Sequence, residues 1–439
     1  MAATGAIDWD DVASEAVEIL RRYLRIDTRN PPGNEGAAAR FLGGILAREG
    51  IPCEYLEPSP GREILIARLA GDGSARPLML ANHTDVVPVE EEHWSHPPFG
   101  AALVGDRIYG RGAVDMKGCG VMQLLAVLLA RRQELPLRRD LVFCALPDEE
   151  VGSDVGMAWL CEHHPELVDV EFELNEGAVG EPGGPDGEPP LFSVAVAEKE
   201  MCELRLLARG RAGHASQPHE DNAALHLIRA LARLADWERG LTLTAPARAY
   251  VERLSEAGLL PPLAREEALR IAVASDPERL ALFTNTLNVT LISAGLKSNM
   301  IPATAEATLD CRLLPGTTPE QWIAAVEERI DDDRIRVELN RRGPRLPMAI
   351  APSETALMDA IRETVAAEVP GAVVALTTSA YGTDNRFLRP RGVAAYGMIP
   401  ALLSEEERRG FHAHDEFITV ENLAQGCRLM YGIVRRACT

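Results

Sequence analysis

The sequence predicts an α/β fold in which a wound, mostly parallel sheet forms a larger domain and a smaller α+β two-layer sandwich is inserted into it. Apolar strand-like runs alternate with helical runs along the first 174 residues, a Gly/Pro-rich segment at 180–190 interrupts the alternation, and the pattern resumes near residue 349. We therefore assign residues 1–196 and 347–439 to the larger domain and residues 197–346 to the insertion.

In the larger domain, helices are predicted where apolar residues recur at helical spacing, and strands where short apolar runs are bounded by turn residues. Asn30-Pro31-Pro32-Gly33 breaks the first helix, and Thr419 is the expected N-cap of the last one. The expected helices span 9–25, 35–48, 118–132, 154–163, 354–367 and 419–436, and the expected strands span 51–57, 63–69, 141–146, 168–174, 372–376 and 393–399. A further buried strand is expected to begin at Leu78 and to deliver His83 and Asp85 at its carboxyl end.

The insertion shows a different pattern, with β-branched, alternating strands typical of an antiparallel sheet. Its expected strands are 203–209, 286–292, 303–313 and 335–339, and its expected helices are 222–234 and 318–330. Residues 236–284 are longer than a plain connection needs, so we predict a local helical elaboration there, to which the sequence assigns no role.

Composition limits the function. A chain of 439 residues with 46% apolar and 25% charged residues suits a globular protein of two domains. Its formal charge of −21 opposes binding to nucleic acid or to an anionic membrane surface, because phosphate would repel it. A small anionic substrate remains possible, since it responds to the local site.

The cysteines and the first residues predict a cytoplasmic protein. The eight cysteines form no Cys-x-x-Cys pair, and several lie in apolar strand-like runs where a thiol behaves as a small hydrophobe, so we expect a reducing compartment. The first eleven residues are acidic and lack the basic and apolar parts of a signal peptide. No apolar run approaches the roughly 18 residues of a membrane span.

Metal-type side chains recur at or near the ends of the expected strands. His83 and Asp85 follow a buried strand, where an open parallel sheet forms its ligand crevice, although His-x-Asp alone would also fit an ordinary surface loop. Five segments with such residues favour a metal site over chance. Imidazole and carboxylate without thiolate suit zinc, with cobalt or manganese possible. The segments contain His83 with Asp85, Asp115, Glu149 with Glu150, Glu176, and His412 with His414.

At this point the sequence resembles the M20 family of metallopeptidases, which includes aminoacylases, succinyl-diaminopimelate desuccinylases, carnosinases and glutamate carboxypeptidases. The resemblance covers nearly the whole chain. Its motifs stand here as Asn-His-Thr-Asp-Val-Val-Pro-Val, Gly-Arg-Gly-Ala-Val-Asp-Met-Lys-Gly, Pro-Asp-Glu-Glu-Val-Gly-Ser, Gly-His-Ala-Ser and His-Ala-His-Asp-Glu-Phe.

The resemblance implies two zinc ions bridged by Asp115. The choice of His412 over His414 rests on the family pattern His-x-x-(Asp/Asn)-Glu, and a helix-cap or core role for His414 stays open. Two Zn²⁺ ions, three carboxylates and one hydroxide would make a neutral cluster. The implied ligands are His83, Asp115 and Glu176 for one ion and Asp115, Glu150 and His412 for the other.

By the same resemblance, Glu149 is the general base that takes a proton from the attacking water and passes it to the leaving amine. Adjacent side chains on an extended turn point apart, which would let Glu150 bind metal while Glu149 faces the water. Asp85 is expected to accept the second ring N–H of His83. The alternative for Glu149 is an exposed acidic turn.

Residues outside the metal cluster are expected to bind substrate. In related enzymes the equivalent of His214 reaches a neighbouring subunit's site and hydrogen-bonds the oxyanion, whereas the alternative is a turn histidine that caps a helix. Asn299 and Arg312 resemble positions that bind a carboxylate, and the alternative is a salt bridge at the sheet edge. Gly382 lies in a segment that resembles the family's glycine-rich substrate loop.

We therefore expect a dinuclear zinc hydrolase that cleaves an amide next to a free carboxylate, in an N-acyl-amino acid or short peptide, through metal-bound hydroxide. The absence of a Gly-x-Ser-x-Gly motif fits this non-covalent route. The alternatives are a C-terminal exopeptidase or dipeptidase with the same site, and a non-catalytic binding protein, which would be expected to lack a ligand or the base. Resemblance also implies a homodimer formed through the inserted domain.

Overall fold

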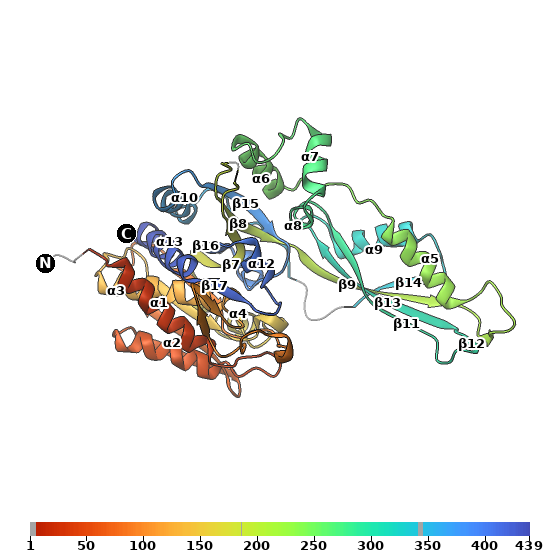
Figure 1. Cartoon of the computed structure of the whole chain (residues 1–439), viewed down its shortest axis with the longest axis horizontal. Helices are drawn as coiled ribbons and strands as arrows, with labels where there is room; N and C mark the ends of the chain where they lie inside the picture. The colour runs from red at the N-terminus through yellow and green to blue at the C-terminus, as the bar shows by residue number, and fades with distance from the viewer. Residues whose placement is uncertain (1–5, 186, 341–345) are drawn as a thin grey trace.

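The computed structural model describes residues 6–185, 187–340 and 346–439. It has a large body, built on an eight-stranded sheet, and a smaller unit that projects from it and is called the arm below (Figure 1). This arrangement confirms the predicted α/β fold with an inserted two-layer unit. No helix in the described ranges is long and apolar enough to cross a membrane.

The body sheet is mixed but mostly parallel at its centre. The neighbouring strands β6, β3, β7 and β16 are parallel, as are β8 and β15, whereas β1 with β2, β2 with β6, and β16 with β8 are antiparallel. The sheet order is β1 (Cys53–Ser59), β2 (Arg62–Leu69), β6 (Leu141–Leu146), β3 (Leu78–His83), β7 (Phe172–Glu181), β16 (Ala394–Leu402), β8 (Leu191–Glu198) and β15 (Val373–Ser379).

Helices cover both faces of this sheet. The central helix α3 (Lys117–Arg132) is apolar on nearly all sides and is buried along its length, as expected for a helix enclosed by a sheet and other helices. The larger core also takes in α1 (Trp9–Leu24), α2 (Gly36–Arg48), α10 (Ala356–Glu368) and α13 (Val420–Cys438). The opposite face carries α4 (Met157–His163) and α11 (Asn385–Leu388). Thr419 caps α13, as predicted.

The arm is a four-stranded antiparallel sheet with two helices on one face. Alternate side chains of β9 and β13 are buried beneath these helices, which explains the period-two pattern of the sequence. The other face turns away from the helices. The sheet order is β11 (Thr286–Ala294), β13 (Thr304–Leu313), β9 (Glu200–Arg209) and β14 (Ile335–Leu339), and the helices are α5 (Ala223–Ala235) and α9 (Pro319–Ile330).

Residues 236–284 contain α6 (Ala245–Glu256), α7 (Glu266–Ala274) and α8 (Pro277–Ala281). These helices pack on the body sheet, where Val251 and Phe283 share a core with Val373 of β15 (Figure 1). The elaboration therefore shields the last strand of the large sheet, whose edge would otherwise be open. As a result the chain passes from the body to the arm after β8 and returns to the body after α5. It passes to the arm again after α8 and returns to the body after β14.

The structure differs from the predicted elements in two places near the site. Strand β8 was not predicted, because no element was assigned between the Gly/Pro-rich segment at 180–190 and the expected strand at 203–209. Strand β7 continues to Glu181, so Glu176 lies inside a strand and not after one. The extension arises because β7 pairs first with β16 and then, at Gly180 and Glu181, with β8.

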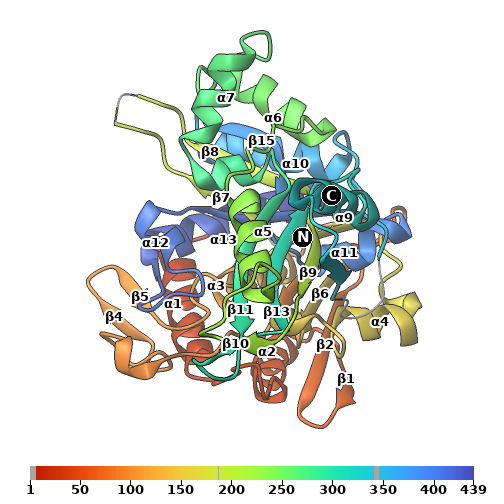
Figure 2. The ribbon, with the colours of Figure 1, turned by 90° about the vertical axis from the view of Figure 1, so that its right-hand side faces the viewer.

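Short elements complete the described structure. A three-stranded sheet of β4 (Ala102–Val104), β5 (Arg107–Tyr109) and β17 (Phe417–Thr419) lies beside the body helices, and α12 (Glu405–Arg409) precedes β17 in the chain. At the far end of the arm, β10 (Gly213–His214) pairs with β12 (Met300–Ile301). Figure 2 shows β11, β13 and α5 from the side on which the arm projects.

Candidate metal centre

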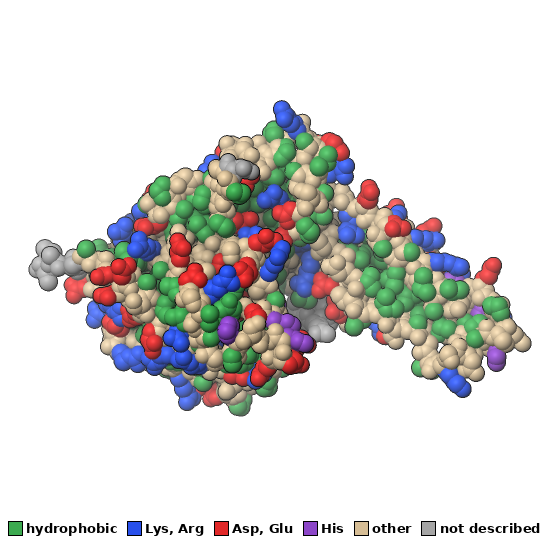
Figure 3. All heavy atoms as spheres, in the orientation of Figure 1, with side chains coloured by type: hydrophobic (Ala, Val, Ile, Leu, Met, Phe, Trp, Pro, Cys, Tyr) green, Lys and Arg blue, Asp and Glu red, His purple; other side chains and the backbone are tan. Residues whose placement is uncertain are grey.

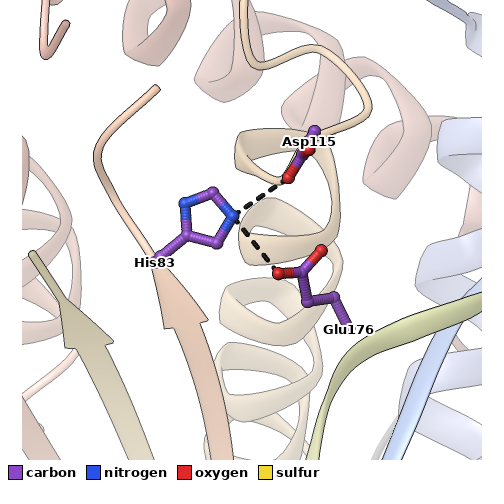
Figure 4. A group of neighbouring side chains, drawn as sticks. All are labelled: His83, Asp115 and Glu176. Carbon is purple, nitrogen blue, oxygen red and sulfur yellow. Dashed lines mark hydrogen bonds and ion pairs between the residues drawn. The ribbon is translucent and has the colours of Figure 1, made fainter. Parts of the chain in front are cut away.

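Three side chains from separate parts of the body converge at the carboxyl end of β3. His83 ends that strand and is buried, Asp115 precedes α3, and Glu176 comes from β7. The His83 Nε2 atom lies 3.0 Å from Asp115 Oδ1 and 3.5 Å from Glu176 Oε1. Both carboxylates therefore point at one imidazole nitrogen (Figure 4).

A second group of three shares Asp115 with the first. The His412 Nε2 atom lies 3.1 Å from Asp115 Oδ2 and 3.3 Å from Glu150 Oε2. Asp115 thus presents one oxygen to each histidine. Within each group the donor atoms lie within 4.8 Å of one another, so each group could hold one metal ion.

The electrostatics of the cluster favour added positive charge. Burial and the nearby Asp115 carboxylate raise the pKa of Glu176 to about 7, and the same two causes raise the pKa of Glu150. Hydrogen bonds to Asp115 and Glu150 raise the pKa of His412 to about 10. Carboxylates so close together repel one another, and a divalent cation between them would relieve that repulsion.

The donor set itself fits divalent metal ions. Two imidazoles and three carboxylates, without a thiolate, match the ligands that zinc takes in hydrolytic sites and also suit cobalt or manganese. The two carboxylate oxygens of Asp115 face different groups, so this residue is shared by both candidate donor sets.

The turn that carries Glu149 and Glu150 depends on its backbone. Both residues lie in a short 3-10 turn between Asp148, which has a φ of 78°, and Gly152, which has a φ of 125°. Asp tolerates the left-handed region better than most residues, and glycine adopts it without strain. The sequence Asp-Glu-Glu-Val-Gly therefore matches the turn that it forms.

A close approach of two strands fixes Glu176. A Cβ atom at Gly397 of β16 would lie 2.3 Å from the Glu176 carbonyl oxygen, so only glycine fits there. The register of β7 and β16 shifts just beyond this point, between Gly397 and Ile399. Neither the need for glycine at position 397 nor the register shift between β7 and β16 was evident from the sequence.

Asp85 differs in one detail from the predicted role. The His83 Nδ1 atom lies 3.0 Å from the backbone carbonyl oxygen of Asp85 but 3.6 Å from its carboxylate, so the backbone is the closer acceptor. The Asp85 carboxylate instead accepts the backbone N–H groups of Glu149 and Glu150, each at 3.2 Å. Asp85 thus supports the turn beside the cluster as well as the imidazole.

Sequence reasoning assigned no role to Glu416, which the structure places directly behind Asp115. This buried carboxylate accepts hydrogen bonds from Arg111 Nη1 at 2.8 Å and from the backbone N–H groups of Gly112, Val114 and Asp115 at 2.8–3.1 Å. It therefore holds the loop that delivers Asp115. The final Glu of the pattern His-x-x-(Asp/Asn)-Glu was the available signal.

His412 and His414 are placed differently. The His412 side chain faces the acidic cluster, although 56% of it is exposed. The His414 Nε2 atom lies 3.2 Å from Glu90 on the surface, and its ring lies beside that of His93. The structure therefore brings only His412 to Asp115 and Glu150.

The cluster opens into a cleft of about 1610 Å³ between the body and the arm (Figure 3). Glu149 lines this cleft, as do Gly382 from the body and Arg312 from the arm. The Arg312 guanidinium makes two hydrogen bonds to Asp310, at 2.7 and 2.9 Å, so the salt bridge of the alternative is present, and substrate binding by Arg312 stays a prediction. Sequence reasoning did not single out Arg386, which also lines the cleft and whose guanidinium donates to the Gly152 carbonyl.

His214 and Asn299 lie together at the far end of the arm. Strand β10 ends at His214 and pairs with β12, and the Asn299 carbonyl accepts the Ala215 N–H at 3.1 Å. The described residues that line the cleft do not include His214 or Asn299. Within one chain the structure therefore does not bring them to the acidic cluster.

Comparison with known proteins decides the family. Residues 79–436 match the model of peptidase family M20/M25/M40. The chain belongs to this family. As a member of family M20/M25/M40 it is a hydrolase that acts on peptide or amide bonds, which confirms the resemblance described above and the expected class of enzyme.

Curated relatives and solved structures agree. The chain is 27% identical to aminoacylase-1 of Pongo abelii over 90% of each chain, and 28% identical to a probable carboxypeptidase S-like protein of Dictyostelium discoideum over 83% of this chain and 72% of that one. A metallo-carboxypeptidase from Sulfolobus solfataricus matches with a TM-score of 0.71 at 20% identity over 96% of this chain and 99% of the other. A dinuclear metal-binding peptidase from Bacillus subtilis matches with a TM-score of 0.61 at 15% identity over 97% and 98%.

Replacement of Glu416 tests how the Asp115 loop is held. Glu416→Ala leaves Arg111 buried without its carboxylate and three backbone N–H groups without their acceptor, so we expect a loss of about 3–5 kcal/mol in the free energy of unfolding. Urea denaturation measures it. Glu92→Ala, at an exposed position, is the control and should change stability little. Equal stability of the two variants would contradict the role of Glu416.

Proposed function

We propose that this family M20/M25/M40 hydrolase is a dinuclear zinc enzyme that cleaves an amide bond adjacent to a free carboxylate, in an N-acyl-amino acid or a short peptide. The observation that carries the proposal is the position of Asp115, which directs one carboxylate oxygen to each of two histidines. The two donor groups on either side of it would hold the two ions.

In this proposal His83, Asp115 and Glu176 hold one ion, and Asp115, Glu150 and His412 hold the other. When bound, such a pair acidifies a shared water and polarises the scissile carbonyl. Zinc is the metal we propose, and cobalt or manganese could replace it, since neither changes the required donors. His83 is held in place by the Asp85 backbone carbonyl, which accepts a hydrogen bond from the Nδ1–H group and leaves Nε2 free as a ligand.

Glu149 is the proposed general base. It lines the cleft beside the metal ligands, and burial together with the Glu176 carboxylate raises its pKa well above the usual range. Because its pKa is raised, the Glu149 carboxylate can take up the proton of the attacking water and keep it until the amine leaves. Its neighbour Glu150 is turned to Asp115 and His412, so the two adjacent acids have separate tasks.

The free carboxylate of the substrate would meet arginine side chains in the cleft. Arg386 is suited to this contact because its guanidinium forms no salt bridge within the described ranges and lies over the Phe387 ring beside Gly382. Arg312 lies across the cleft on the arm and keeps one nitrogen, Nη1, outside its bonds to Asp310. We propose that these two guanidinium groups select an anionic substrate end.

His214 has the geometry of an outward-facing donor. Its Nδ1 atom accepts the backbone N–H of Ser216 at 3.2 Å, and because a backbone N–H can only donate, the neutral ring must carry its proton on Nε2. An N–H in that position can stabilise an oxyanion. Since His214 lies far from the cluster of its own chain, we propose that it acts in the site of a partner subunit.

The arm offers a surface for such a partner. Strand β11 pairs only with β13 in the described sheet, which leaves its other edge open. Leu291 and Ile292 of β11 are 67% and 64% exposed, and Ile228 of the neighbouring α5 is 59% exposed. An apolar surface next to an open strand edge favours a symmetric dimer through the arm, as Figure 3 suggests by the hydrophobic side chains gathered there.

Exopeptidase or dipeptidase activity with the same residues is the second candidate. The volume of the cleft, about 1610 Å³, exceeds that of a usual small-molecule pocket and could accommodate a short peptide. We also propose a cytoplasmic, reducing environment, because the eight cysteines are free thiols and seven of them are buried.

Removal of the base tests the proposed chemistry. In the zinc-loaded protein, Glu149→Gln should lower kcat for N-acetyl-amino acids or dipeptides by at least about a hundredfold, because the amide cannot carry the proton. Zinc content, measured by atomic emission, should stay at that of the unchanged protein. Glu92→Gln is the matched control at an exposed position. Persistent turnover in Glu149→Gln would contradict the role of Glu149, and preference for dipeptides would favour the second candidate.

A mixed dimer tests the role of His214. We expect Glu149→Gln and His214→Ala to be nearly inactive alone, with metal content unchanged. A purified heterodimer of the two should recover about half of the normal activity per dimer, since one site then combines an intact Glu149 with the partner's intact histidine. Failure to recover activity in a heterodimer that is verified by sedimentation would contradict action across the interface.

A further inference from the structure

Two buried carboxylates lie directly beneath the turn that carries Glu149 and Glu150. Asp85 accepts the backbone N–H groups of both glutamates, each at 3.2 Å. Asp148, at the start of the turn, accepts the N–H of Val155 through Oδ2 at 3.1 Å. The turn is therefore attached at both ends to carboxylate groups, and its position depends on where these two groups are held.

Asn30 joins the two carboxylates. Its Nδ2 atom donates to Asp85 Oδ2 at 2.9 Å and to Asp148 Oδ1 at 3.2 Å, and the residue is 3% exposed. Ionised carboxylates only accept hydrogen bonds, so the amide nitrogen of Asn30, and not its oxygen, must face them. The two hydrogens of one NH₂ group thus span both acceptors, which neither an apolar side chain nor a carboxylate could do.

The chain positions Asn30 through backbone pairing with the segment that follows β3. The Asn30 N–H donates to the Val86 carbonyl at 2.9 Å, and the Val86 N–H donates to the Thr28 carbonyl at 3.1 Å. The Thr28 hydroxyl donates to the Thr84 carbonyl at 2.7 Å. Asn30 is therefore fixed relative to His83 and Asp85, whereas the turn it contacts is more than a hundred residues away in sequence.

A partly buried arginine contacts the same carboxylate of Asp148. Arg62 of β2 donates to Asp148 Oδ1 at 2.7 Å and also pairs with the buried Glu35. The Asp148 Oδ1 atom thus accepts hydrogen bonds from both the Arg62 guanidinium and the Asn30 amide. Arg62 compensates the charge of Asp148, whereas Asn30 links Asp148 to Asp85, in addition to the backbone N–H groups of the turn that Asp85 accepts directly.

We propose that Asn30 is a positioning residue for the reaction: it sets the separation of Asp85 and Asp148 and thereby the placement of Glu149 and Glu150 relative to His83 and Asp115. This inference rests on the proposed function, in which Glu149 moves the proton and Glu150 holds a metal ion. It differs from a purely structural role, because it predicts that removing the Asn30 amide lowers kcat or zinc affinity and not only the stability of the protein.

The test compares Asn30→Leu, which keeps the size but removes both hydrogen bonds, with Thr28→Val, which removes a buried hydrogen bond of the same segment without touching the turn. Zinc binding by each protein is measured by competition with a chromogenic chelator. Activity is measured on zinc-saturated protein with N-acetyl-amino acids, and thermal unfolding measures stability.

For Asn30→Leu we expect a fall of about 10- to 100-fold in kcat, in the affinity for one of the two zinc ions, or in both, because groups behind metal ligands have effects of this size. KM should change by less than about threefold, since the substrate-binding arginines are untouched. Thr28→Val should lower the midpoint of thermal unfolding and leave kcat and both zinc affinities within about threefold of the unchanged protein.

The inference is overturned if Asn30→Leu binds both zinc ions normally and its kcat falls no more than that of Thr28→Val. It is also overturned if kcat and KM worsen together in both variants, because the segment would then act only through stability. If the unchanged protein binds zinc but hydrolyses no N-acyl-amino acid or dipeptide, the proposed function fails, and the zinc affinities still decide whether Asn30 positions the turn.

Discussion

The mutual repulsion of buried carboxylates around Asp115 is the constraint on which the rest of this structure depends. Asp115, Glu150 and Glu176 are gathered within reach of two imidazoles, and burial raises the pKa of both glutamates. Such a group of acids is costly in the absence of cations. The fold accepts that cost at the carboxyl end of the central strands, which is where sheets of this kind place their ligand sites.

The scaffold keeps these acids in place largely with other carboxylates that accept backbone N–H groups. Glu416 holds the loop before α3, and Asp85 holds the turn that begins after β6. Each acts on a segment distant in the sequence, so that the loops are fixed relative to the strands. Glu416 and Asp85, which lie next to the candidate ligands in the sequence motifs, thus support the loops that carry those ligands.

The sequence predicted the parts of the fold whose signal is local. Strand β6 and the helix α3 were expected almost at their observed bounds because their apolar runs are continuous and end at turn residues. Strand β8 was missed because it follows a Gly/Pro-rich break, and Glu176 was expected after a strand that in fact continues through it. The extension depends on pairing with β16 and β8, which no local pattern reveals.

In the candidate site, too, local sequence signals were predictive and contacts between distant segments were not. The residues that could bind metal were found from motifs, whereas the roles of Glu416 and Asn30 depend on contacts across more than a hundred residues of sequence. The most direct test of the two-metal site is anomalous X-ray scattering at the zinc edge from crystals of the zinc-loaded protein. The account predicts two peaks, one among His83, Asp115 and Glu176 and one among Asp115, Glu150 and His412. A single peak, or peaks away from Asp115, would contradict it.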